Sequence, residues 1–242
     1  MELHIQPTAE HVLAELADYF VAQASRAIAA RGRFVVTLSG GNSPKKLYEL
    51  LASPAYREKV SWQHVYFFFG DERNVPATDT ESNYRMAKQA LLEPLSIAAA
   101  QVFAVDTTLP PAEAAAAYTR TIQEFFGTEE ARFDLVLLGL GDNSLTASLF
   151  PHTPVLHDAS VGAREVFLED KKVFRITLTA PLINQARAVA FLVYGADKAA
   201  AVQRVQRGPR DVDEFPAQLI APAGELHWFL DQPAASLLPR QS

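Results

Sequence analysis

Four small or polar residues at positions 39–42 have the types and spacing expected of a site for an anion. Ser39 ends the apolar run 33–39, and Gly40, Gly41 and Asn42 follow it and lead into a segment of helical pattern. Glycines let the backbone approach a ligand closely, and the free N–H groups at the start of a helix attract negative charge. The same residues also suit a tight strand-to-helix turn without a ligand, so both interpretations stay open for this segment alone.

Charged residues at or within other apolar runs could contact the same anion. Asp71 and Arg73 end the run VYFFFGDER, and Asn83 follows ten residues after Arg73. Arg175 lies inside FRITLT, where an unpaired guanidinium is costly, so it needs a ligand or a buried carboxylate as partner. Lys198 could add a point charge, while an arginine fork suits phosphate oxygens and Asp71 could orient it or accept a sugar hydroxyl. The alternative is a set of solvated surface charges.

Alternating strand and helix patterns place these residues at the ends of strands. Strands are expected at 33–39, 65–73, 133–139, 173–179, 188–194 and 226–230. Helices are expected at 9–31, from 43, at about 83–92, after Pro111 up to Gly127, and after 195. Such alternation predicts an α/β fold with a doubly wound, mostly parallel, Rossmann-like sheet and helices on both faces. Ligands of such sheets bind beyond the carboxyl ends of the strands.

Capping residues define the ends of several expected helices. Thr8 is expected to cap the first helix and Gly32 to end it, while Ser43 is expected to cap the helix that Pro44 begins. The polar segment that follows 133–139 can open another helix. We find no linker that divides the 242 residues. We therefore expect one domain over 1–242 with a loosely held tail at 232–242.

Composition argues against several classes of partner and cofactor. The net charge of -6 argues against a broad nucleic-acid surface, and the absence of cysteine removes disulfides, thiol nucleophiles and zinc–thiolate sites. The six histidines show no metal-ligand spacing, so we expect neither metal nor other cofactor. No stretch approaches the roughly 18–20 apolar residues of a membrane span, and no secretory signal is visible, which together with zero cysteines favours the cytoplasm.

The segment 138–151, LGLGDNSLTASLFP, resembles the 6-phosphogluconolactonase signature LGxGxDGHTASLFP. Five further blocks, SGGNSPKKLY, FFFGDERNVP, SNYRM, FRITLT and YGADKAAAV, occur in the order and at roughly the spacing of that family. The resemblance implies a fold similar to glucosamine-6-phosphate deaminases and ribose-5-phosphate isomerases. It also implies hydrolysis of 6-phosphogluconolactone in the oxidative pentose phosphate pathway. We expect a monomer or small homo-oligomer. Deaminases usually have AFNEP in place of TASLFP, so deaminase or isomerase chemistry is the less favoured alternative.

The resemblance also implies a mechanism and a set of binding residues. In that family water attacks the lactone carbonyl with the help of a general base, without metal or covalent intermediate. The residues implied to bind the phosphorylated sugar lactone or to support its binding are Ser39, Gly40, Gly41, Asn42, Asp71, Arg73, Asn83, Arg175 and Lys198.

Leu145 occupies the position of the family's basic histidine, and a leucine cannot accept a proton. In the same triplet Asn143 replaces aspartate and Ser144 replaces glycine. His152 and Asp142 are candidate substitute bases, with a surface-loop histidine and a helix-capping aspartate as the alternatives. Four explanations stay open: binding of a sugar phosphate without catalysis, a substitute base, a different reaction on a similar sugar phosphate, or a deliberately altered sequence.

Overall fold

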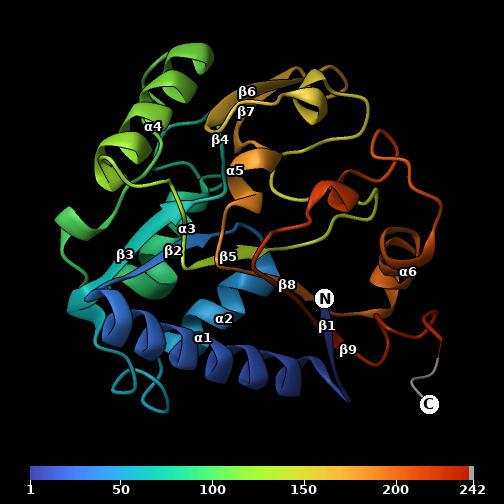
Figure 1. The fold of residues 1–242 in the computed structure, drawn as a ribbon, viewed down its shortest axis with the longest axis horizontal. Helices are drawn as coiled ribbons and strands as arrows, with labels where there is room; N and C mark the ends of the chain where they lie inside the picture. Colours follow the sequence, from blue (N-terminus) through green and yellow to red (C-terminus); the bar gives the residue numbers. More distant parts are fainter. Residues whose placement is uncertain (240–242) are drawn as a thin grey trace.

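Six parallel strands form one sheet in the computed structural model, which describes residues 1–239 (Figure 1). Their order is β1-β9-β8-β5-β2-β3. Their bounds are β1 Glu2–Gln6, β2 Phe34–Leu38, β3 Val65–Phe69, β5 Leu135–Leu138, β8 Ala188–Val193 and β9 Glu225–Asp231. From β2 the chain continues to the neighbouring strand β3, towards one edge of the sheet. From β5 the next strand of this sheet is its other neighbour β8, towards the opposite edge. The predicted doubly wound, parallel arrangement is confirmed.

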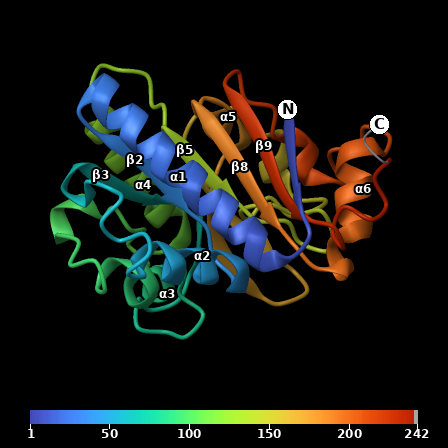
Figure 2. The same ribbon diagram turned by 90° about the horizontal axis from the view of Figure 1, so that it is seen from below.

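Helices cover both faces of this sheet, and Figure 2 shows α1 lying across one of them. Alternate residues of β2 belong to the two cores, with Phe34, Val36 and Leu38 on the α1 side and Val35 on the α4 side. On the first face lie α1 Ala9–Arg31, α2 Asn42–Ala52 and α3 Asn83–Ala87, and on the second lie α4 Pro111–Phe126, α5 Ala180–Asn184 and α6 Ala199–Arg207. Shorter helical turns are the 3-10 segments Trp62–His64, Ala99–Gln101, Pro154–His157, Ala196–Lys198 and Pro216–Leu219 and the π segment Lys88–Leu92.

A separate antiparallel sheet corrects two of the expected strands. The expected strand 65–73 is divided at Gly70, whose N–H donates to Leu38 O and whose carbonyl accepts from Leu178 N, both at 2.9 Å. The chain thereby leaves the large sheet and continues as β4. The expected strand 173–179 also lies outside the parallel sheet. The small sheet has the order β4-β7-β6, with bounds β4 Asp71–Arg73, β7 Val173–Leu178 and β6 Ala163–Leu168.

The capping predictions are partly confirmed. The Thr8 hydroxyl accepts a hydrogen bond from the backbone of α1, and Gly32 ends that helix with a φ of 74°. The prediction for Ser43 is wrong, because α2 begins at Asn42 with Gly41 as its N-cap. Gly41 has a φ of 104°, which is accessible mainly to glycine. The expected helix after β5 is also absent, since residues 139–151 form turns and loop.

The two ends of the described chain lie at the same edge of the large sheet. Strand β1 was not anticipated, and it pairs with β9 because both present apolar side chains to the cores. Beyond β9, the Gln232 N–H donates to Gln6 O at 2.8 Å, and Ala234 is buried. Residues 240–242 of the expected tail lie outside the described residues.

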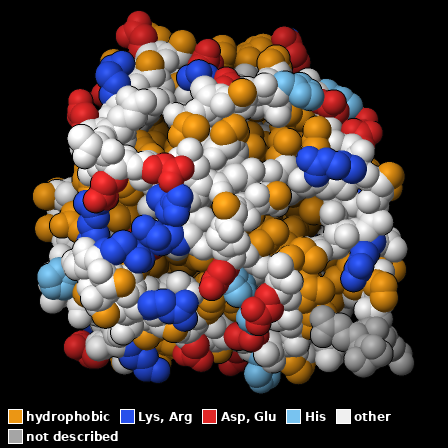
Figure 3. All heavy atoms as spheres, viewed as in Figure 1, with side chains coloured by type: hydrophobic (Ala, Val, Ile, Leu, Met, Phe, Trp, Pro, Cys, Tyr) orange, Lys and Arg blue, Asp and Glu red, His pale blue; other side chains and the backbone are white. Residues whose placement is uncertain are grey.

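The surface carries side chains of both charge signs. On the face seen in Figure 3, the largest group of basic side chains borders acidic ones. Among the helices of residues 1–239, none combines the length and the apolar character needed to cross a bilayer.

Candidate active site

A cavity of about 430 Å³ lies beyond the carboxyl ends of β2, β3, β5 and β8, and we call it the strand-end cavity. It occupies the point where the connections after β2 and β5 diverge, the usual ligand position in such folds. Eight of the nine residues predicted to bind substrate line it, namely Ser39, Gly40, Gly41, Asn42, Asp71, Arg73, Asn83 and Lys198. The sequence blocks therefore converge at one place.

The turn after β2 forms one wall of the cavity. Tyr48 fixes this turn, because its hydroxyl accepts from Ser39 N–H and donates to Ser39 O, both at 2.8 Å. Burial raises the pKa of Tyr48, so the hydroxyl keeps its proton. A Cβ at Gly40 would lie 2.0 Å from Asn83 Oδ1. Glycine is thus required at position 40 to accommodate the Asn83 amide.

Glu72 organises the loop that carries the charged residues. This buried carboxylate accepts backbone hydrogen bonds from Arg73 N at 2.7 Å, Asn83 N at 2.8 Å and Tyr84 N at 2.9 Å, and one from the Ser82 hydroxyl at 3.3 Å. Burial raises the pKa of Glu72, although the three backbone donors oppose the rise. Sequence reasoning did not assign Glu72 a role. Its position between Asp71 and Arg73 was the available signal.

Asp71 is the enclosed carboxylate of the strand-end cavity. Its oxygens accept hydrogen bonds from the Ser148 hydroxyl at 2.6 Å and from Asn83 Nδ2 at 3.2 Å. Burial raises the pKa of Asp71, while the Ser148 hydrogen bond and the charges of Arg73 and Arg175 oppose the rise. A carboxylate with a raised pKa is a stronger base than an ordinary aspartate. Ser148 was not singled out from the sequence, although it belongs to TASLFP.

Two arginines lie side by side next to Asp71. The antiparallel pairing of β4 and β7 places Arg73 opposite Arg175. Arg73 donates to Glu81 O at 2.6 Å. Burial and the charge of Arg73 lower the pKa of Arg175. Within residues 1–239, no carboxylate oxygen lies within 4.0 Å of the Arg175 guanidinium. Arg175 is not a lining residue, but its charge is available to an anion near Arg73.

Lys198 and Asp142 form an ion pair at the cavity. Lys198 Nζ donates to Asp142 Oδ1 at 2.5 Å, and the Asp142 side chain is 75% exposed. Arg204 also donates to the carbonyl oxygen of Asp142. Asp142 neither lines the cavity nor caps a helix, since none follows it. Its carboxylate is therefore engaged by Lys198 in this structure.

One residue of the triplet that departs from the family pattern, Leu145, lines the strand-end cavity, whereas Asn143 lines a different cavity. Leu145 folds over Gly141, where a Cβ would lie 2.7 Å from Leu145 Cγ. Asn143 Oδ1 accepts from Leu145 N at 3.3 Å. Ser144 is buried with a φ of 62°, and its hydroxyl has no hydrogen-bond partner within residues 1–239. The positive φ explains why the family pattern has glycine at this position.

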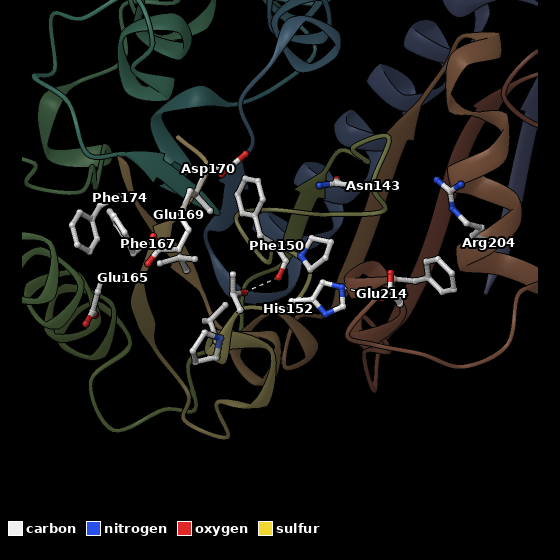
Figure 4. Close-up of a pocket in the computed structure, with 17 residues that line it drawn as sticks. Asn143, Phe150, His152, Glu165, Phe167, Glu169, Asp170, Phe174, Arg204 and Glu214 are labelled. Carbon is white, nitrogen blue, oxygen red and sulfur yellow. Dashed lines mark hydrogen bonds and ion pairs between the residues drawn. The ribbon is translucent and has the colours of Figure 1, made fainter. Parts of the chain in front are cut away.

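His152 lies at a different and larger cavity, of about 1,070 Å³ (Figure 4). Its Nε2 lies 2.9 Å from Glu214 Oε1, and its side chain is 63% exposed. Phe150 and Phe174 also line this second cavity. The structure therefore does not bring His152 together with the predicted binding residues. The strand-end cavity is the better candidate site because it combines the glycine turn, Asp71 and several cations.

The donor set of the strand-end cavity does not resemble a metal centre. Its lining residues, all within 1–239, include the carboxylates Asp71 and Asp197 but neither histidine nor cysteine. Asp71 lies near two arginines, whose positive charge disfavours a further cation there. Transition metals prefer imidazole or thiolate ligands.

Comparisons with known proteins agree with the fold and identify the family of the chain. The family described as glucosamine-6-phosphate isomerases/6-phosphogluconolactonase matches residues 7–228. A 6-phosphogluconolactonase of Synechocystis sp. is 43% identical over 219 residues, covering 88% of both chains, and one of Nostoc sp. is 39% identical over 241 residues, covering 98% of both. The structure of 6-phosphogluconolactonase from Trypanosoma cruzi superposes with a TM-score of 0.86 at 28% identity, covering 99% of this chain and 97% of that one. The chain therefore belongs to the glucosamine-6-phosphate isomerase/6-phosphogluconolactonase family.

Proposed function

We propose that the protein hydrolyses 6-phosphogluconolactone to 6-phosphogluconate in the oxidative pentose phosphate pathway. The observation that carries the proposal is the convergence of Ser39–Gly41, Asp71, Arg73 and Lys198 on one cavity. The names of the similar proteins support the same substrate. The proposal makes the protein a carboxylic ester hydrolase that needs no cofactor.

In this proposal the cations bind the substrate's phosphate. Arg73 and Lys198 line the cavity, Arg175 lies beside Arg73, and the turn at Gly40–Gly41 supplies backbone N–H groups at the start of α2. Charge-assisted hydrogen bonds to phosphate oxygens are roughly twice as strong as neutral ones. A bound phosphate would also offset the burial of the Arg175 charge, which lacks a carboxylate partner within residues 1–239.

Asp71 is the general base in this proposal. It accepts a proton from water while the water oxygen adds to the lactone carbonyl carbon. The tetrahedral intermediate then expels the ring oxygen, which takes up the proton from Asp71, so the base is regenerated and the product is an open sugar acid. The proposal favours Asp71 over His152 and Asp142, because His152 lines another cavity and Asp142 is paired with Lys198.

A comparison with spontaneous ring opening tests the proposal. We expect purified protein to consume 6-phosphogluconolactone faster than a buffer control, and to bind 6-phosphogluconate. Lactone loss at the control rate, with 6-phosphogluconate still bound, would replace this proposal by a non-catalytic sugar-phosphate-binding protein. Leu145 is the observation that favours that second candidate, since it removes the family's base from the cavity. Ammonia release from glucosamine 6-phosphate would instead support deaminase chemistry.

We also infer the setting in which the protein acts. The absence of cysteine supports a reducing compartment such as the cytoplasm. Its partner is the phosphorylated sugar lactone, and we propose a monomer or small homo-oligomer that binds no nucleic acid. Size-exclusion chromatography with light scattering measures the oligomeric state.

A further inference from the structure

Two histidines from opposite ends of the chain lie next to each other at the edge of the parallel sheet. The parallel pairing of β1 and β9 sets Glu2 opposite His227 and His4 opposite Phe229. His4 Nε2 lies 2.9 Å from His227 Nδ1. The Glu2 carboxylate oxygens lie 3.7 Å from His4 Nε2 and 3.6 Å from His227 Nδ1. We call Glu2, His4 and His227 the His–His–Glu cluster.

Each histidine contacts a second carboxylate through its other ring nitrogen. His4 Nδ1 lies 3.0 Å from Glu15 Oε1 of α1, and His227 Nε2 lies 3.2 Å from Glu225 Oε2. Because an ionised carboxylate only accepts hydrogen bonds, these contacts place the N–H of each neutral ring on its outer nitrogen. The two inner nitrogens then direct lone pairs at each other across 2.9 Å. A proton or a cation must lie between them.

Packing fixes the orientation of both rings. His4 stacks on Phe229 with ring centroids 4.3 Å apart and an angle of 6° between the planes. His227 is buried, with 6% of its surface exposed. Gln6 Nε2 donates to Glu15 Oε2 at 2.8 Å, so the carboxylate that contacts His4 is itself held. Metal-ligating histidines commonly have such carboxylate partners, which fix the tautomer and the ring.

The geometry points to a site for one divalent transition-metal ion, and we propose that the His–His–Glu cluster binds Zn²⁺ or a similar cation, with water completing its coordination. Zinc bonds of about 2.1 Å separate donor atoms by about 3.0 Å at octahedral angles and about 3.4 Å at tetrahedral angles. The three separations here, 2.9, 3.6 and 3.7 Å, lie close to this range. Three carboxylates, those of Glu2, Glu15 and Glu225, supply negative charge around two imidazoles.

This site is separate from the strand-end cavity. Glu2 begins β1 and His227 lies near the start of β9, whereas the strand-end cavity lies beyond the carboxyl ends of other strands. A bound ion would join β1, β9 and, through Glu15, α1. The spacing of histidines in the sequence did not indicate this site, because two ligands are separated by 223 positions and only strand pairing unites them. Because the cluster lies away from the strand-end cavity and joins β1 to β9, we expect the metal to stabilise the fold rather than to support hydrolysis.

Zinc titration of tag-free, chelator-treated protein tests the proposal. We expect calorimetry to give one Zn²⁺ per chain, Zn²⁺ to raise the melting temperature, and both effects to be lost in His4→Gln. His157→Gln is the matched control, since His157 contacts a carboxylate, that of Asp213, but lies outside the cluster. Zinc binding that is equal in wild type and His4→Gln, or no binding at all, would overturn the proposal.

Two further variants keep the test informative if His4→Gln folds poorly. The Glu2 side chain is 65% exposed, so Glu2→Gln should fold normally and still weaken Zn²⁺ binding. Glu15→Gln should weaken it about 10- to 100-fold, as is usual for partners of ligating histidines. Anomalous diffraction at the zinc edge should place the ion between His4 Nε2 and His227 Nδ1. An anomalous peak elsewhere, with none at the cluster, would contradict the assignment.

Discussion

The hydroxyl of Ser148 donates a 2.6 Å hydrogen bond to the carboxylate of Asp71. This contact joins the loop after β5 to β4 across 77 positions of sequence. It stabilises the charged form of Asp71 and so opposes the rise in the pKa of this carboxyl that burial causes. The pKa of the proposed base therefore depends on two opposing effects. Desolvation raises this pKa and makes the carboxylate a stronger base, whereas hydrogen-bond donors and nearby cations lower it and favour the ionised form.

Replacing Asp71 should reduce activity and increase stability. Between the ordinary pKa of 3.8 and the raised one, the folded chain binds more protons than the unfolded chain, so stability falls as pH rises through that interval. At neutral pH we expect Asp71→Asn to raise the melting temperature, by about 2–4 °C for each kcal/mol gained. We expect its kcat to fall about 10²- to 10⁴-fold, the usual contribution of a general base.

Asp197→Asn is the control for that substitution, because Asp197 lines the same cavity with a 71% exposed side chain. Assays of lactone hydrolysis near pH 7 measure kcat, and calorimetry at the same pH measures the melting temperature. An Asp71→Asn enzyme with wild-type kcat would exclude Asp71 as the base.

Removing the Ser148 hydroxyl should move the pH profile. The hydrogen bond from Ser148 lowers the pKa of Asp71, so Ser148→Ala should raise that pKa further. Because the base acts in its ionised form, the acidic limb of kcat/KM should shift to higher pH. Ser43→Ala, which changes another hydroxyl of the cavity lining, should leave the limb in place. An unchanged limb in Ser148→Ala would show that a different group governs the profile.

Introducing an imidazole at position 145 should increase hydrolysis. Leu145 lines the strand-end cavity, so Leu145→His places a group that titrates near neutrality beside the substrate. We expect kcat to rise above that of the wild type, because the imidazole adds a second group that can accept the proton of the attacking water besides Asp71. Leu145→Asn, a polar residue without basicity, should give no such rise. If Leu145→His folds and binds 6-phosphogluconate yet gains no activity, the assumption that the rest of the site is competent loses its support.

Ser144 is a local source of instability. Its φ of 62° favours glycine, and its buried hydroxyl has no partner within residues 1–239. We expect Ser144→Gly to increase the free energy of unfolding by about 1–2 kcal/mol, after allowance for the greater chain entropy of glycine. Ser144→Ala removes only the hydroxyl and should recover part of this gain. Urea unfolding of the three proteins measures it, and a less stable Ser144→Gly would contradict the expectation.

The parts predicted from the sequence are those determined by local pattern. The apolar runs and the glycines after them indicated the parallel sheet, the turn at Gly40 and the convergence of Asp71, Arg73 and Lys198. Such features follow from strand order and from the common edge of parallel strands. The division of an expected strand at Gly70 was not visible, because it depends on pairing with β7.

Contacts between distant segments could not be predicted from one sequence. Nothing local to Ser148 indicated Asp71 as its acceptor, and nothing local to His4 indicated His227. Proximity in sequence was also misleading, because His152 follows the signature segment closely and yet lines another cavity. Each of these outcomes is decided by the tertiary fold.

A crystal structure of the complex with 6-phosphogluconate tests the central claim most directly. The account predicts phosphate oxygens within about 2.7–3.1 Å of Arg73 or Arg175 and of the Ser39–Gly41 turn, with the ligand's carboxyl group beside Asp71. Ligand bound in the larger cavity next to His152 would contradict it.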